Sequence, residues 1–115
     1  MSVTFGPVSD MLVTVKSREI QRGMTREMRG DRAGAARHFL AAAHLELVLA
    51  DDYALNDDDD LAFRSQLSAA SCFWRAGQQE RAKATFGALS QDFPRRKTEI
   101  QTTLRELESH RAANG

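Results

Sequence analysis

The stretch FWRAGQQERAKATFGALSQDFP, residues 73–94, places small residues, aromatic residues and a final proline at regular intervals. Gly77 separates two runs of helix-forming residues, Ala82 and Phe86 are one helical turn apart, and Pro94 ends the second run. A tight turn between helices favours glycine, and closely packed helices favour a small residue at their crossing with an aromatic side chain beside it. The stretch therefore predicts a helix–turn–helix packing unit.

The segment GDRAGAARHFLAA, residues 30–42, repeats this pattern. In each copy a glycine is followed, after five, nine and twelve residues, by small or apolar residues, and a small residue precedes it by seven positions. The matching positions are Gly23, Gly30, Ala35, Phe39 and Ala42 in the first copy, and Ala70, Gly77, Ala82, Phe86 and Leu89 in the second.

The two copies resemble tetratricopeptide (TPR) repeats, which are antiparallel helix pairs with a period of about 34 residues. The second copy matches the family pattern at Ala70, Phe73, Gly77, Ala82, Phe86 and Pro94. The first copy has Arg26 where an aromatic residue is expected, and it lacks the closing proline. The resemblance covers residues 16–112 and implies an all-α, right-handed array of helix pairs whose concave face binds peptides.

Helix-forming residues dominate the chain, and we expect five helices in a single domain, residues 1–115. An N-terminal extension, residues 1–8, precedes a first helix pair, residues 9–50, in which Ser9 caps the first helix. An acidic connection, residues 51–56, leads to a second pair, residues 57–93, with Asn56 as the N-cap. A C-terminal capping helix, residues 94–112, completes the array.

The composition is that of a soluble protein with little general affinity for nucleic acid or membrane. Lys and Arg total 16, as do Asp and Glu, so the formal net charge is zero. No apolar run approaches the roughly 20 residues that span a bilayer, and the N-terminus lacks the pattern of a secretory signal. Cys72 is the only cysteine. We therefore expect a cytoplasmic protein whose thiol is reduced and serves as a small packing residue.

The sequence contains no pattern typical of an enzyme, a metal centre or a cofactor site. The acidic run between Asp51 and Asp60 lacks the glycine and the final glutamate of an EF-hand loop in either register. His38 and His44 are six residues apart and fall on different sides of a helix. An alternative is a small regulatory or metal-binding or ligand-binding domain that uses these histidines and the acidic run. A third reading is a nucleic-acid binder that uses Arg95, Arg96 and Lys97.

The function that the resemblance implies is non-catalytic protein–protein interaction, as an adaptor or assembly module. Methionines one helical turn apart suit an adaptable groove, although packing in the core is the alternative for both. Because two helix pairs bury little surface, we also hypothesise a homodimer through Leu12, Val13, Val15, Ile20 and Met24 of the first helix. The expected partner-binding residues are Met24 and Met28 from the first helix and Arg64, Ser68, Ser71 and Arg75 from the third.

Overall fold

The computed structural model describes residues 7–114, and the side chains of residues 9–110. Within that part the chain forms helices and no strand, so the all-α prediction is confirmed. Of the expected extension, residues 1–8, the first six residues lie outside the described part. The elements are α1 (Pro7–Met28), α2 (Arg32–Leu55), α3 (Asp59–Arg75), α4 (Gln79–Asp92), a 3₁₀ turn η1 (Pro94–Arg96) and α5 (Lys97–Asn114).

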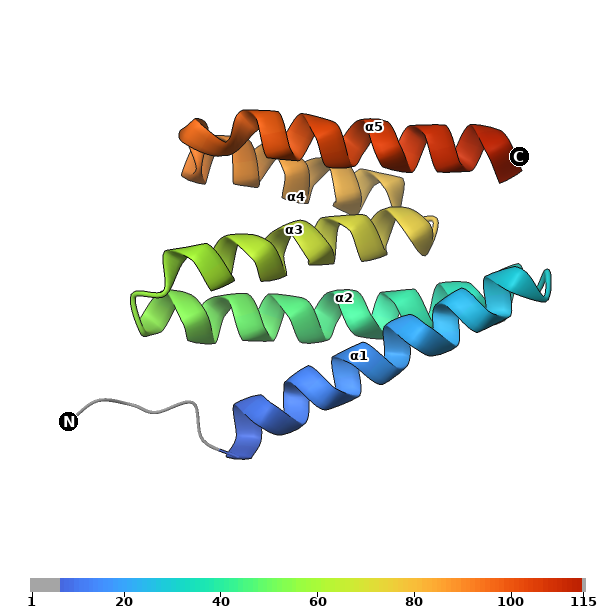
Figure 1. The fold of residues 1–115 in the computed structure, drawn as a ribbon, viewed down its shortest axis with the longest axis horizontal. Coiled ribbons are helices and arrows are strands. Elements are labelled where there is room, and N and C mark those ends of the chain that lie inside the picture. Colours follow the sequence, from blue (N-terminus) through green and yellow to red (C-terminus); the bar gives the residue numbers. More distant parts are fainter. Residues whose placement is uncertain (1–6, 115) are drawn as a thin grey trace.

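The helices run up and down in chain order (Figure 1), and each packs mainly against its neighbours in the sequence. α2 is central, with α1 on one side and α3 on the other, and α5 lies along α3 and α4. The turns after α1 and α3 therefore lie at one end of the molecule. The turn after α2 lies at the other end, and so does η1. The longest dimension, 49 Å, separates these two ends.

The three helix–helix turns share one backbone geometry. At each turn, one residue with positive φ follows the helix: Gly30 (78°), Asp57 (59°) and Gly77 (78°). The amide of this residue and the next amide donate to carbonyl groups of the last helical turn at 2.9–3.1 Å, which is the Schellman arrangement. Glycine adopts positive φ without steric cost, so the predicted bends at Gly30 and Gly77 have the expected cause.

The turn between α2 and α3 corrects two expectations. α2 continues to Leu55, so most of the expected acidic connection is helical and only residues 56–58 join the helices. Asn56 was expected to cap α3, but it caps the end of α2, where its Nδ2 donates to the Asp52 carbonyl at 2.8 Å. Asp58 is the N-cap of α3, because its carboxylate accepts a hydrogen bond from the Leu61 amide.

The start of α1 also differs from the prediction. The helix begins at Pro7, and Ser9 is a buried residue of its first turn rather than the N-cap. Proline suits this first position, because its ring sets a helical φ and its missing N–H group has no partner there in any case.

The repeat residues form the core of the array. Phe39 has no exposed surface and lies at the crossing of α1 and α2, where an added Cβ on Gly23 would meet its ring at 2.9 Å. Glycine therefore allows α1 to approach this ring. Pro94 begins η1, while the other predicted packing positions, Ala35, Ala42, Ala70, Phe73, Ala82 and Phe86, are all buried.

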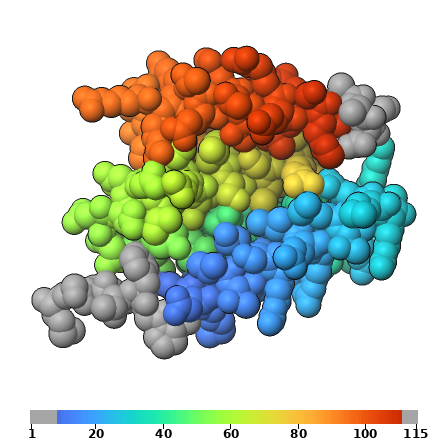
Figure 2. All heavy atoms as spheres, in the orientation of Figure 1, coloured from blue at the N-terminus to red at the C-terminus, as the bar shows by residue number. Residues whose placement is uncertain are grey.

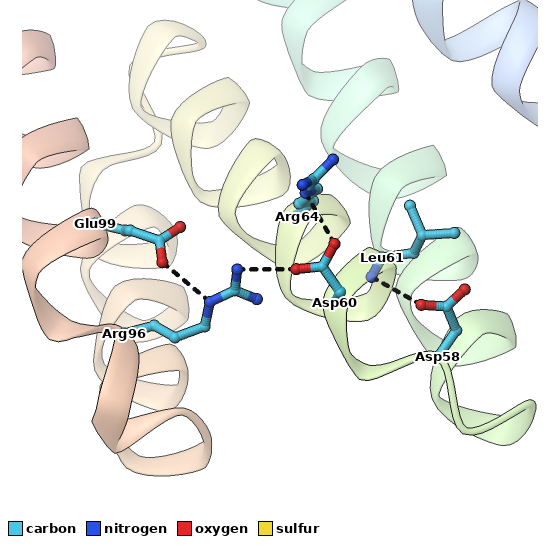
Figure 3. Close-up of polar contacts among 6 residues, drawn as sticks. All are labelled: Asp58, Asp60, Leu61, Arg64, Arg96 and Glu99. Atoms are coloured by element: carbon cyan, nitrogen blue, oxygen red, sulfur yellow. Dashed lines mark hydrogen bonds and ion pairs between the residues drawn. The ribbon is translucent and has the colours of Figure 1, made fainter.

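An ionic cluster joins the start of α3 to the start of α5 (Figure 3). The Asp60 carboxylate lies between Arg64, 3.2 Å away on the same helix, and Arg96 of η1, 2.8 Å away. Arg96 also donates to Glu99 at 3.1 Å, and its guanidinium stacks over the Phe63 ring at 4.1 Å. These contacts hold η1 against α3, so α5 begins at a fixed position.

Candidate functional site

A groove of about 1090 Å³ lies at the end of the array where the turns after α1 and α3 meet the last part of α5. In Figure 2 the gold surface of the turn after α3 lies between the cyan turn after α1 and the red α5. The alternation of the helices creates this arrangement, because it brings every second turn to the same end. The groove is lined by Glu27, Met28, Gly30, Arg32, Ala33, Ala35, Ala36, Trp74, Arg75, Ala76, Gly77, Gln79, Leu107 and His110.

The lining combines apolar surface with basic side chains. Met28 has 87% of its surface exposed, whereas Trp74 and Leu107 are half-buried and pack against the core. Arg32 and Arg75 carry positive charge at the groove, and Glu27 is its one carboxylate among the residues described. An apolar surface with a few polar groups at fixed positions is typical of a binding site.

Arg75 is held by contacts with the core and with α1. Its guanidinium stacks over the Phe39 ring at 4.3 Å and donates to the Glu27 carboxylate at 2.5 Å. The Arg75 Nε atom is buried and has no hydrogen-bond partner. Because the stacked ring belongs to the core, Arg75 links the groove to the packing of α1, α2 and α3.

The six predicted partner-binding residues do not form one site. Met28 and Arg75 line the groove, whereas Met24 lies one helical turn earlier on α1 and is 45% exposed. Neither methionine is a core residue. Arg64 lies at the other end of α3, where it pairs with Asp60.

Two of the six are serines that take part in contacts within their own helix. The Ser71 hydroxyl donates to the Leu67 carbonyl at 3.0 Å, and the Ser68 side chain forms a hydrogen bond with the Cys72 thiol. Both serines are half-buried.

The expected dimer surface on α1 is partly covered. Leu12, Val13, Val15 and Ile20 are half-buried, and Ile20 packs against the core. Met24 is the member of this set with an exposed side chain.

The two histidines of the alternative function lie in different surroundings. His38 makes a 2.6 Å contact from its Nδ1 atom to Glu19 of α1. His44 meets the edge of the Phe73 ring, with 5.5 Å between ring centroids, and lies beside Arg81. Within the described part of the chain, no three His, Cys, Asp or Glu side chains gather in a way that could hold a metal ion.

The basic cluster near the start of α5 is divided between two environments. Arg96 is engaged by Asp60, Glu99 and the Phe63 ring, while Arg95 and Lys97 are exposed. Over the residues that the structure describes, no helix is long and apolar enough to cross a membrane.

A buried polar cluster between α1, α2 and α3 was not predicted from the sequence. Glu46 has 2% of its surface exposed and pairs with Lys16 at 3.5 Å, but its Oε1 atom has no hydrogen-bond partner. Burial and the Glu46 charge raise the pKa of the nearby Cys72 thiol to about 11. The thiol is therefore protonated at neutral pH and is a weak nucleophile, because the thiolate is the reactive form.

Comparisons of the chain with protein-family models, with curated proteins and with solved structures find no match.

Proposed function

We propose that this protein is a non-catalytic protein–protein interaction module, built as a TPR-like array of two helix pairs with a capping helix. The observation that carries the proposal is the groove at the end of the array, which combines exposed apolar surface with arginine side chains. The shared positions of the two helix pairs, with positive φ at Gly30 and Gly77, support the TPR-like interpretation.

The chemistry of the groove favours a segment that carries carboxylates beside a large apolar side chain. Met28, Trp74 and Leu107 offer the apolar contact, while Arg32 suits a carboxylate group because guanidinium binds it in a planar, two-point geometry. Because Arg75 and Glu27 neutralise each other, Arg32 gives the lining its net positive charge. The partner in this proposal is thus an acidic peptide segment with an apolar anchor.

A displayed peptide library, selected on the purified protein, tests the proposal. We expect the selected peptides to be enriched in Asp and Glu next to Leu, Phe or Met. We also expect Met28→Glu to weaken their binding by about tenfold or more, because it places a carboxylate in the apolar part of the groove.

Met11→Glu provides a matched control, since Met11 is also an exposed methionine on α1 but lies far from the groove. Its binding of the selected peptides should equal that of the unmodified protein. Selection without any acidic enrichment, or equal losses in the two variants, would falsify the assignment of the groove.

A further inference from the structure

The turn between α2 and α3, at the end of the array opposite the groove, has the chemistry that the groove prefers. We call residues 55–60 the acidic corner. Leu55 is 82% exposed, and Asp57 and Asp59 beside it are exposed and form no ion pair within the described part of the chain. The corner therefore presents a large apolar side chain flanked by carboxylates.

The groove offers the opposite charge around its own apolar surface. Arg32 lines it and Arg29 is exposed at the adjoining turn, while the charge of Arg75 is matched by Glu27. Leu55 matches the apolar part of the groove, which includes Met28. Complementary charge around an apolar contact steers association and sets the orientation of the two partners.

The two surfaces lie at opposite ends of the array. The acidic corner is a tight turn at the left end of Figure 1, and the turns after α1 and α3, which border the groove, lie at the right end. In Figure 2 the green surface of the corner lies at the edge of the molecule opposite the cyan turn after α1. The corner of one copy can thus meet the groove of another.

We propose that a second copy of this chain occupies the groove through its acidic corner, with Leu55 in the apolar part and Asp57 and Asp59 facing Arg29 and Arg32. This inference rests on the proposed function, because it names a partner for the same groove. The two surfaces are different and lie at opposite ends of the molecule, so the contact is heterologous. Each pair leaves one corner and one groove free, and copies add head to tail.

Sedimentation velocity of the purified protein tests the assembly. At concentrations from about 1 to 200 µM we expect the mean sedimentation coefficient to rise without reaching a fixed dimer value. The rise should be strong near 50 mM salt and weak near 500 mM, because salt screens exposed charges over roughly a Debye length. A concentration-independent monomer at low salt would overturn the proposal.

Two variants, mixed together, test the head-to-tail geometry. The groove variant is Met28→Glu/Arg32→Glu, and the corner variant is Leu55→Gln/Asp57→Asn/Asp59→Asn. All five residues are exposed, so both variants should fold, which circular dichroism and melting temperature will establish.

Each variant alone should remain monomeric, because each lacks one of the two surfaces. Their mixture should form a heterodimer and no larger species, since one intact groove meets one intact corner. A variant that still forms a dimer on its own would instead indicate a symmetric contact, such as one through α1, and would overturn the proposal.

The library selection separates this inference from the proposed function. If the protein stays monomeric but selects acidic peptides that Met28→Glu loses, the self-assembly is wrong and the groove remains a peptide site. If neither assembly nor peptide binding occurs, both proposals are wrong. Peptides that compete with assembly would support both.

Discussion

The crossing of α1 with α2 and the pairing of α3 with α4 use matching sequence positions: Gly23 and Phe39 in the first pair, Ala70 and Phe86 in the second. Around these positions the two pairs differ. The first pair includes ionic contacts between its helices, from Lys16 to Glu46 and from Glu19 to His38, and Glu46 is almost fully buried.

The second pair is packed by alanine, leucine and aromatic side chains, with Ala82 and Leu89 fully buried. Burial of apolar surface is not directional, whereas a buried charge must meet its partner in one geometry. Apolar contact therefore stabilises the second pair, whereas the ionic contacts of the first pair fix the position of α1. Four measurements test this difference between the pairs.

The largest effect should come from removing the aromatic side chain of each pair. Phe39→Ala should lower the free energy of unfolding by about 4 kcal/mol, because it leaves a cavity where α1, α2 and Arg75 meet. Phe86 is 6% exposed, and its replacement by Ala should cost about 3 kcal/mol. Urea unfolding measures both values, and a larger loss for Phe86→Ala would contradict the central role of Phe39.

The buried ion pair of the first helix pair should give the next largest effect. Lys16→Met should lower the free energy of unfolding by about 3 kcal/mol, because it leaves the buried Glu46 carboxylate without its cation. The double replacement Lys16→Met/Glu46→Leu serves as the control and should restore most of the loss, since no buried charge remains. Equal losses in the single and double variants would show that the charge is not the cause.

Replacing either of two helical glycines with alanine should change the free energy of unfolding, but in opposite directions. Gly23→Ala should lower the free energy of unfolding by about 2 kcal/mol, because its Cβ would overlap the buried Phe39 ring. Gly87 of α4 has open space around it, and Gly87→Ala should raise the same quantity by about 0.5–1 kcal/mol, because alanine is the better helix former. Thermal or urea unfolding measures both changes, and a gain in stability for Gly23→Ala would contradict the close approach of α1 to Phe39.

The fourth effect is a dependence on alkaline pH. The Cys72 thiol has an ordinary pKa of 9.0 and a folded-state pKa of about 11, so between these values the unfolded chain loses a proton that the folded chain keeps. The free energy of unfolding should therefore fall with rising pH in this window, by about 1 kcal/mol per pH unit.

Cys72→Ala gives the comparison for this slope. Burial also raises the pKa of Tyr53, but that group is present in both proteins, so the difference between their pH profiles reports the thiol. Urea unfolding at several pH values from 8 to about 11 measures it. Parallel profiles would show that the thiol is not held in its protonated form.

Sequence reasoning was most accurate where one residue type has one physical role. Gly30 and Gly77 mark turns that need positive φ, and Phe39 and Phe86 mark packed crossings, so these positions could be assigned from their spacing. The end of α2 was misjudged because Asp and Asn favour both turns and helix caps. The local sequence does not show that Asp57, rather than a glycine, adopts the positive φ at that turn.

The groove could not be predicted from any single stretch of sequence. Its lining comes from five helices and two turns, and Leu107 lies 79 positions after Met28 in the chain. The alternation of turns gives a partial signal, because the turns at Gly30 and Gly77 must share one end of an up-and-down array. The burial of Glu46 also gave no signal, since a glutamate in an apolar helix is equally consistent with a solvent-facing position.

The packing of each helix mainly on its neighbours in the chain has a consequence for how the protein folds. Contacts between residues that are close in the sequence close small loops, so little chain entropy is lost before they form. The chain should reach its native structure within roughly microseconds to milliseconds, as helical proteins of low contact order do. Its outer helices, α1 and α5, can separate from the rest without opening the centre, so hydrogen exchange should be slowest in α2 and α3.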